Sequence, residues 1–199
     1  MDLPLDDNKQ LDELYIQALM LSKVIRRILD KKADIKLSRN PTYILKPVTE
    51  FMNRLRVSSI EKFEEKTYIS TINFYKNSAD LAQHNALGAL IIYVGESYLV
   101  KLIKDLNYPE VDEDDTESMV DAIGTFCNLI AGNFKAGLTQ LGYIELVMSH
   151  FSGYENDVLA GVEFSPDQGA MYEIQFEIGG EKRIIAELSM SHIPMMEDE

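Results

Sequence analysis

Residues that form covalent or metal cross-links are scarce in this sequence. It contains one cysteine and three histidines. One cysteine cannot form an internal disulfide, and His84, His150 and His192 stand too far apart in the chain for the short spacings typical of metal sites. We therefore predict that the protein carries no metal ion and no cofactor of its own.

Basic residues are few relative to acidic ones. The chain has 19 Lys and Arg residues against 33 Asp and Glu residues, a formal net charge of −14 at pH 7. Negative charge on this scale repels the phosphates of nucleic acids and the headgroups of anionic lipids. The composition therefore argues against a nucleic-acid partner and against binding at a membrane surface.

Long apolar runs are missing as well. No uninterrupted run approaches the roughly 18 apolar residues of a membrane span, and the opening MDLPLDDNKQ is acidic where a signal peptide is basic and then apolar. We therefore expect a soluble, cytoplasmic protein. Its 199 residues, 46% of them hydrophobic, suffice for one domain with a full core and an appendage.

An apolar stripe is the first pattern along the chain. Between residues 6 and 30, apolar residues recur at intervals of three and four, which predicts a helix with one apolar face. Residues 33–40 break this pattern before Pro41. We predict an N-terminal helical extension with its linker over residues 1–40 and a main domain over residues 41–199. The apolar face needs a cover, either the chain's own domain, which we favour, or the same helix of a second copy.

Helical and strand patterns occur in groups in the main domain. Alternating residues predict a half-buried strand over 66–75, and a continuous apolar run predicts a fully buried strand over 86–95. Gly142 is expected to end a long helix, and Gly179 with Gly180 marks a hairpin. The predicted elements are, in order, helix 47–61, strand 66–75, strand 86–95, helix 96–106, helix 117–141, and strands 144–153, 170–179 and 182–193. Such grouping, without regular alternation of strand and helix, predicts an α+β fold on a mostly antiparallel sheet.

The long helix carries a stripe of polar and small residues. Asp121, Thr125, Asn128 and Gly132 follow one another at spacings of four, three and four, which places them on one face. The simplest interpretation is that this face is the solvent side of a buried helix. An asparagine in mid-helix is nevertheless mildly unfavourable, because its side chain competes for backbone hydrogen bonds.

The sequence of this helix, DAIGTFCNLIAGNFKAGL, resembles the signature helix of the CheC, CheX and FliY family of bacterial chemotaxis phosphatases, and CheX most of all. In that family an Asp or Ser is followed four residues later by Glu, and three residues later again by Asn. Here the pattern falls on Asp121, Thr125 and Asn128, followed by Ile-Ala-Gly-Asn at residues 130–133. The order of elements over residues 43–193 also resembles CheX, which implies a fold with two long packed helices related as a pseudo-repeat.

The resemblance implies a partner and a mechanism. The substrate would be a phosphorylated receiver domain of the CheY type, which itself supplies Mg²⁺ at its phosphoryl-aspartate. Asn128 would orient a water molecule for in-line attack on phosphorus, so that catalysis works mainly by positioning. The family glutamate pairs with a receiver lysine and docks the helix. The resemblance to CheX also implies a homodimer.

Threonine at position 125 departs from the family pattern. It carries no charge and is shorter than glutamate, so it cannot pair with a lysine in the same way. Three explanations stay open. Asp121, one turn earlier, contributes a carboxylate; Asn128 alone supports weak phosphatase activity; or the domain has lost catalysis and serves as a binding or structural module of a two-component or flagellar-switch assembly.

A second pair has the same Glu-x-x-Asn spacing. Glu50 and Asn53, in TEFMNRL, fall on the predicted helix 47–61, where Pro47 suits the first turn. They form a second candidate site, although an exposed helix face is the simpler interpretation. Cys127, next to Asn128, is expected to point into the interior as a small apolar residue.

Overall fold

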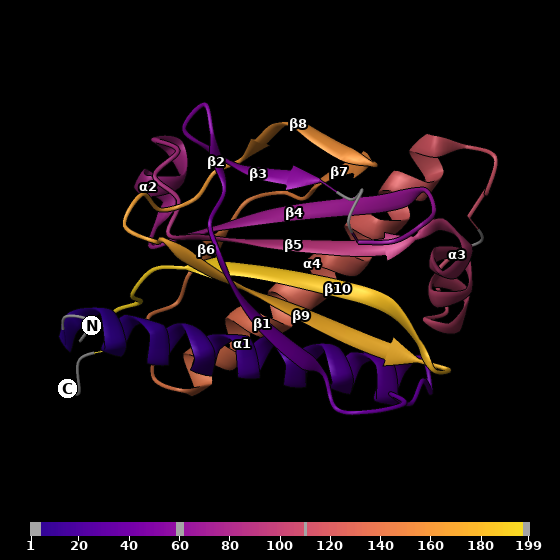
Figure 1. Cartoon of the computed structure of the whole chain (residues 1–199), viewed down its shortest axis with the longest axis horizontal. Coiled ribbons are helices and arrows are strands. Elements are labelled where there is room, and N and C mark those ends of the chain that lie inside the picture. Colours follow the sequence, from indigo (N-terminus) through magenta and orange to yellow (C-terminus); the bar gives the residue numbers. More distant parts are fainter. Residues whose placement is uncertain (1–4, 59–61, 110, 197–199) are drawn as a thin grey trace.

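The computed structural model describes residues 5–58, 62–109 and 111–196 (Figure 1). The elements in this part of the chain are α1 (Leu5–Lys32), β1 (Thr42–Pro47), β2 (Glu50–Phe51), β3 (Arg54–Ser58), β4 (Thr67–Tyr75), α2 (Ser78–Ala82), β5 (Gly88–Gly95), α3 (Glu96–Asp105), α4 (Thr116–Gln140), β6 (Val147–Met148), β7 (Ser152–Glu155), β8 (Asp157–Val162), β9 (Ala170–Ile178) and β10 (Glu181–Met190).

A central sheet organises the molecule. Its strand order is β1-β9-β10-β5-β4-β6, with β7 also pairing with β4. All of these strand pairs are antiparallel. β9 and β10 form the predicted hairpin, in which Gly179 and Gly180 have φ angles of 64° and 85°, a backbone region that favours glycine. The predicted α+β fold with a mostly antiparallel sheet is confirmed.

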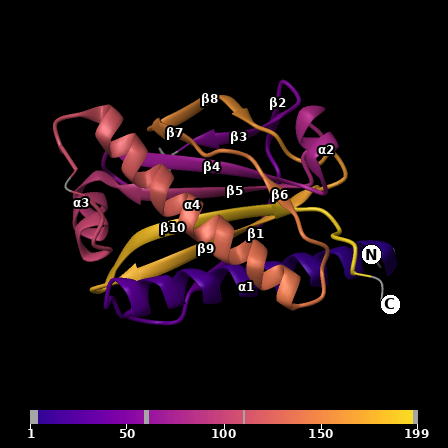
Figure 2. The same cartoon turned by 180° about the vertical axis from the view of Figure 1, so that it is seen from behind.

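Both faces of the central sheet are covered. The long helices α1 and α4 pack against each other on one face (Figure 2), and the small sheet β2-β3-β8 covers part of the other (Figure 1). Along β5 the side chains alternate accordingly: Leu90 and Ile92 join the core under the helices, whereas Ile91 and Tyr93 join the core under the small sheet. Every residue of β4 is buried for the same reason, so the prediction of a half-buried strand is wrong.

The N-terminal helix α1 belongs to the main hydrophobic core. Its buried residues Leu14, Leu21 and Ile25 lie in the same cluster as residues of the central sheet and α4, and α1 packs against β9 and β10. The expectation that its own domain covers its apolar face is confirmed. One core therefore spans the boundary predicted at residue 40. The long helix that packs against α4 is α1, which was predicted as an extension outside the pair of packed helices.

The helix predicted over residues 47–61 is wrong. Over residues 50–58 the structure has β2, a turn and β3 in its place, with positive φ angles of 51° at Met52 and 59° at Asn53; residues 59–61 lie outside the described part of the chain. Leu55 and Val57 alternate with arginines and bury their side chains against the far face of the central sheet. The alternation in Arg-Leu-Arg-Val is the period of a strand, and burial of the apolar pair decides the outcome against helix propensity.

The segment predicted as one strand over residues 144–153 contains only the short β6 and the start of β7, and β8 was not predicted. In contrast, β5, α3, α4, β9 and β10 fall close to the predicted ranges. As expected, Gly142 follows the end of α4 with a φ angle of 93°. Within the described ranges, no helix is long and apolar enough to cross a membrane.

Candidate functional site

The start of α4 is held by capping. The side chain of Asp115 accepts a hydrogen bond from the backbone N–H of Glu117 at 3.2 Å, and the acidic side chains there face the positive end of the helix dipole. Further along, Phe126, Ile130 and Phe134 are fully buried in the core under the helices. The cap fixes where α4 begins, and the buried face determines which side of the helix points outward.

The predicted stripe lies on that outward side. Asp121, Thr125 and Asn128 are exposed and Gly132 is half-buried, while the opposite face of α4, which includes Ile123, Phe126, Ile130 and Phe134, is buried. The prediction that these residues share one face is therefore confirmed. Side chains one turn apart on such a face have Cβ atoms about 5–6 Å apart, close enough to contact one docked partner together.

The two asparagines of α4 differ in their hydrogen bonding. The Asn133 amide donates to the backbone carbonyl of Leu129 at 2.8 Å. The Asn128 side chain has no hydrogen bond within the described part of the chain, and the same is true of Asp121 and Thr125. The amide of Asn128 can therefore donate to and accept from a water molecule or a partner.

Gly132 has no packing reason for being glycine. A Cβ atom at Gly124 would lie 2.1 Å from the ring of Phe151, and one at Gly137 would lie 2.9 Å from Sδ of Met20, whereas one at Gly132 would meet no atom within 4 Å. Glycine in a helix costs about 1 kcal/mol relative to alanine. Because Gly132 has no side chain, the helix surface one turn after Asn128 has room for another backbone to come close.

Cys127 points into the interior, as expected. It is fully buried, with Sγ 3.8 Å from the carbonyl oxygen of Ser70, and burial raises the pKa of its thiol to about 12. Such a thiol stays protonated and is a poor nucleophile. Among the described residues, no group of three or more His, Cys, Asp and Glu side chains is placed to hold a metal ion.

Glu50 and Asn53 do not share a helix face. Glu50 is in β2 and Asn53 is in the following turn, on the small sheet that covers the side of the central sheet opposite to α4 (Figures 1 and 2). The Glu-x-x-Asn spacing matters only where the chain is helical, because residues three apart in a strand point to opposite faces. The structure therefore removes the helical basis of this second candidate site.

A buried charged cluster on the same side was not anticipated. Lys62 is only 9% exposed and pairs with both Glu173 and Glu187, and Tyr93 donates from its hydroxyl to Glu187. Lys46 also pairs with Glu173. The available signal was that Glu173 and Glu187 belong to the two strands of the predicted hairpin, where they lie opposite each other, but a single sequence does not show that Lys62 meets them there.

The pKa values of Glu173 and Lys62 in this cluster favour their charged forms. Burial opposes ionisation of Glu173, but hydrogen bonds from Lys46, Lys62 and Gln175 outweigh it and lower the pKa of this carboxyl to about 2. Burial likewise opposes the charge on Lys62, but attraction to Glu187 and hydrogen bonds to both carboxylates raise the pKa of its ammonium group. Paired in this way, the cluster joins the segment after β3 to the central sheet.

Solved structures with the same fold come from chemotaxis proteins. A CheC-like superfamily protein from Shewanella sp. PV-4 superposes with a TM-score of 0.57 and 14% identity over 88% of this chain and 97% of that one. CheX from Vibrio vulnificus gives 0.54 and 12%, over 87% and 97%. A chain in the CheX-CheY-BeF₃-Mg²⁺ complex from Borrelia burgdorferi gives 0.52 and 13%, over 88% and 98%.

The chain therefore has the CheC/CheX fold, and the resemblance noticed in the signature helix is confirmed at the level of the fold. No family model matches the sequence, and no curated protein matches it.

Proposed function

We propose that this protein binds a phosphorylated receiver domain of the CheY type through the exposed face of α4 and hydrolyses its aspartyl phosphate. The observation that carries the proposal is the exposed Asn128, whose amide has no partner in the described part of the chain, at the signature position of a CheC/CheX fold. The Borrelia burgdorferi structure, a CheX bound to CheY, supports a partner of this type.

Asn128 is the residue that acts on the reaction in this proposal. Its side-chain oxygen accepts a hydrogen bond from water and its amide nitrogen donates one, which together hold the water in line with the phosphorus atom. Mg²⁺ bound by the receiver neutralises charge on the phosphoryl oxygens. Gly132 leaves room for the receiver backbone to approach α4 closely.

We expect the receiver to dock more weakly on this protein than on CheC- or CheX-type proteins that carry the glutamate. Thr125 offers only a hydroxyl, so the nearest carboxylate on the stripe is that of Asp121, exposed and one turn earlier. The net charge of −14 also slows the approach of another acidic protein. The receiver therefore needs a local basic patch facing the start of α4.

The test is phosphate release from CheY-type receivers of the same genome, phosphorylated with acetyl phosphate in the presence of Mg²⁺. The wild-type protein is expected to accelerate release, and Asn128→Ala to remove the acceleration. Asn133→Ala is the matched control, since the amide of Asn133 is bonded to its own helix. Equal rates for the wild type and Asn128→Ala would refute the assigned role.

The second candidate function is a binding module without catalysis, and the uncharged Thr125 favours it. In that case the wild type binds a receiver loaded with BeF₃⁻ and Mg²⁺ but leaves phosphate release unchanged, and Thr125→Glu creates activity. Asn128→Ala then leaves receiver affinity largely intact. The two assays, binding and release, thus separate the two functions.

A homodimer is the second part of the proposal. The buried apolar residues of α1, such as Leu14, Leu21 and Ile25, pack within their own core, so they give no reason to expect a dimer. The small sheet instead exposes Phe51, Met52 and Leu159, which are 57%, 81% and 87% exposed. Light scattering at micromolar concentration should give twice the mass of the chain, and Met52→Ser with Leu159→Ser should reduce it to a monomer. A monomeric wild type would contradict the dimer.

A further inference from the structure

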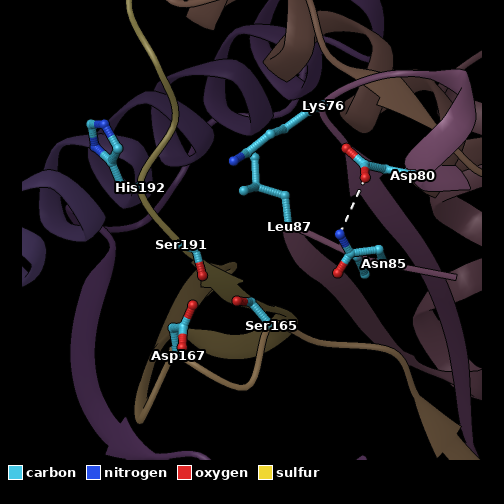
Figure 3. Close-up of a pocket in the computed structure, with 9 residues that line it drawn as sticks. Lys76, Asp80, Asn85, Leu87, Ser165, Asp167, Ser191 and His192 are labelled. Atoms are coloured by element: carbon cyan, nitrogen blue, oxygen red, sulfur yellow. Dashed lines mark hydrogen bonds between the residues drawn. The ribbon is translucent and has the colours of Figure 1, made fainter. Parts of the chain in front are cut away.

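A cavity of about 320 Å³ lies at one end of the central sheet (Figure 3). Its lining residues lie between β4 and β5, between β8 and β9 and after β10, and none of them belongs to α4. Asp80 in its wall already accepts a hydrogen bond from the amide of Asn85 at 3.1 Å. This cavity is therefore separate from Asn128, whose surroundings come from the edge of the sheet instead.

One row of positions along α4 leads to Asn128. Val120, Gly124 and Asn128 follow one another at spacings of four, which places them in line on one flank of the helix. A Cβ atom built at Gly153 of β7 would lie 2.6 Å from the side chain of Val120. One built at Gly124 would lie 2.1 Å from the ring of Phe151, just before β7. The edge of the sheet thus follows this flank, and Asn128 is the next position of the row after the ring.

Phe151 lies at a β-bulge. Between the pairs that β6 and β7 make with β4, the edge of the sheet has three residues, 149–151, where β4 has two, 72 and 73. The backbone N–H of Ser149 donates to the carbonyl of Asn73 at 2.9 Å, which fixes the first of the three. A bulge redirects side chains and is frequent beside active sites. Here the ring of Phe151 packs with the core under the helices.

The side chain of Asn128 is expected to reach back toward this ring. Side chains in a helix point toward its N-terminus, so each covers the surface of the preceding turn. For Asn128 that turn contains Gly124 and Thr125. Gly124 has no side chain, and the ring of Phe151 occupies the space where one would be. The amide of Asn128 therefore has the ring on one side and Thr125 on the other.

We propose that Phe151 is a positioning residue for Asn128, an inference that rests on the proposed phosphatase function. The ring closes the space over Gly124 and so reduces the number of rotamers open to the Asn128 side chain. Because the amide is ordered before the receiver arrives, less entropy is lost when it holds the attacking water. Gly124 is part of the same arrangement, since a side chain there would displace the ring.

NMR of the full chain without a receiver tests the position of the ring. A nuclear Overhauser effect between the ring protons of Phe151 and the side-chain amide protons of Asn128 is expected. Gly124→Ala should shift these amide resonances, because the added methyl group pushes the ring away. Gly137→Ala is the matched control: its methyl group would meet the flexible end of Met20 at 2.9 Å and should leave the resonances of Asn128 unchanged. Absence of the Overhauser effect in the wild type overturns the proposal.

Phosphate release tests the consequence for the reaction. Phe151→Leu should lower kcat by about tenfold and leave KM for the receiver unchanged, because the ring orients Asn128 and does not dock the receiver. Phe164→Leu is the matched control, since Phe164 is also partly buried but packs against the core under the small sheet, and it should leave kcat unchanged. Equal kcat values for the wild type and Phe151→Leu overturn the proposal.

The two assays separate this inference from the proposed function. A wild type that releases no phosphate would refute the proposed function. The Overhauser effect and the response to Gly124→Ala need no activity, so they decide in either case whether the ring holds Asn128.

Discussion

On the helical side of the central sheet, the outer face of α4 carries Thr125 and Asn128 without partners in the described part of the chain, whereas on the opposite side Lys62, Glu173 and Glu187 satisfy one another in a buried cluster. Both sets consist of polar side chains. They differ in exposure and in how much of their hydrogen-bonding capacity is used. Used capacity in a buried cluster indicates a structural role, whereas unused capacity on an exposed face leaves the side chains free to bond water or a partner.

The largest effect is expected from breaking the buried cluster. Lys62→Met leaves the carboxylates of Glu173 and Glu187 buried with less positive charge, so the free energy of unfolding should fall by about 3–5 kcal/mol. Denaturant unfolding measures it. Lys66→Met is the matched control, because Lys66 pairs with Glu96 at a half-exposed site, and an ion pair in contact with solvent contributes little to stability. Equal losses in the two variants would show that the cluster is no more structural than a surface ion pair.

The same cluster predicts a dependence of stability on pH. The pKa of Glu173 is lowered to about 2 in the folded protein, below its unfolded value of about 4.3. Its ionised form therefore stabilises the fold by about 3 kcal/mol above pH 4.3, and this contribution is lost as the pH falls from there toward 2. Denaturant unfolding of the wild type and Glu173→Gln across this window measures it. A wild-type slope equal to that of the variant would contradict the shift.

On the exposed side, Asn128→Ala should leave stability nearly unchanged and reduce accelerated phosphate release by about 100-fold, the size expected for losing a positioned water. The free energy of unfolding and the rate of release are measured on the same preparation. Loss of stability together with loss of rate would mean that Asn128 belongs with the structural residues rather than with the partner surface.

Gly132→Leu tests the same face by steric bulk. Because no atom lies within 4 Å of a Cβ built at Gly132, the variant should be more stable than the wild type by about 1 kcal/mol, yet bind the receiver about tenfold more weakly. Lys23→Leu on the exposed side of α1 is the control for an added apolar side chain. Unchanged receiver affinity in Gly132→Leu would exclude this part of α4 from the interface.

The smallest effect is expected at Thr125. Thr125→Glu adds a carboxylate that can pair with a receiver lysine at an exposed site, so receiver affinity should rise a few-fold, within the roughly 1 kcal/mol typical of such pairs. Titration with a BeF₃⁻-loaded receiver measures it at low and high salt. A gain that persists unchanged at high salt would contradict an ion pair.

The stripe on α4 was predictable because it depends on local spacing. Asp121, Thr125 and Asn128 share a face in any helix, and α4 formed where its apolar spacing predicted it. The β9-β10 hairpin followed in the same way from two consecutive glycines. These features need only a few neighbouring residues, so no knowledge of the rest of the fold was required.

The segment over residues 47–61 shows where local reasoning fails. The apolar residues Leu55 and Val57 are compatible with a helix or with a strand. They form a strand because, as a strand, they bury their side chains against the face of the central sheet that the long helices do not cover. Without that helix, the Glu-x-x-Asn spacing no longer places Glu50 and Asn53 on one face. The alternation of arginine with these apolar residues was the signal to follow.

The sequence by itself determined the long amphipathic helices, the main strands of the sheet and the outward stripe of α4, because periodicity and turn residues act over short distances. The tertiary structure decided that α1 belongs to the main core, that β4 is covered on both sides, and that Lys62 meets two glutamates from separate strands. It also laid the ring of Phe151 over Gly124 of α4. Such contacts join residues far apart in the chain, and their pairing depends on strand order and layer packing, which local patterns do not encode.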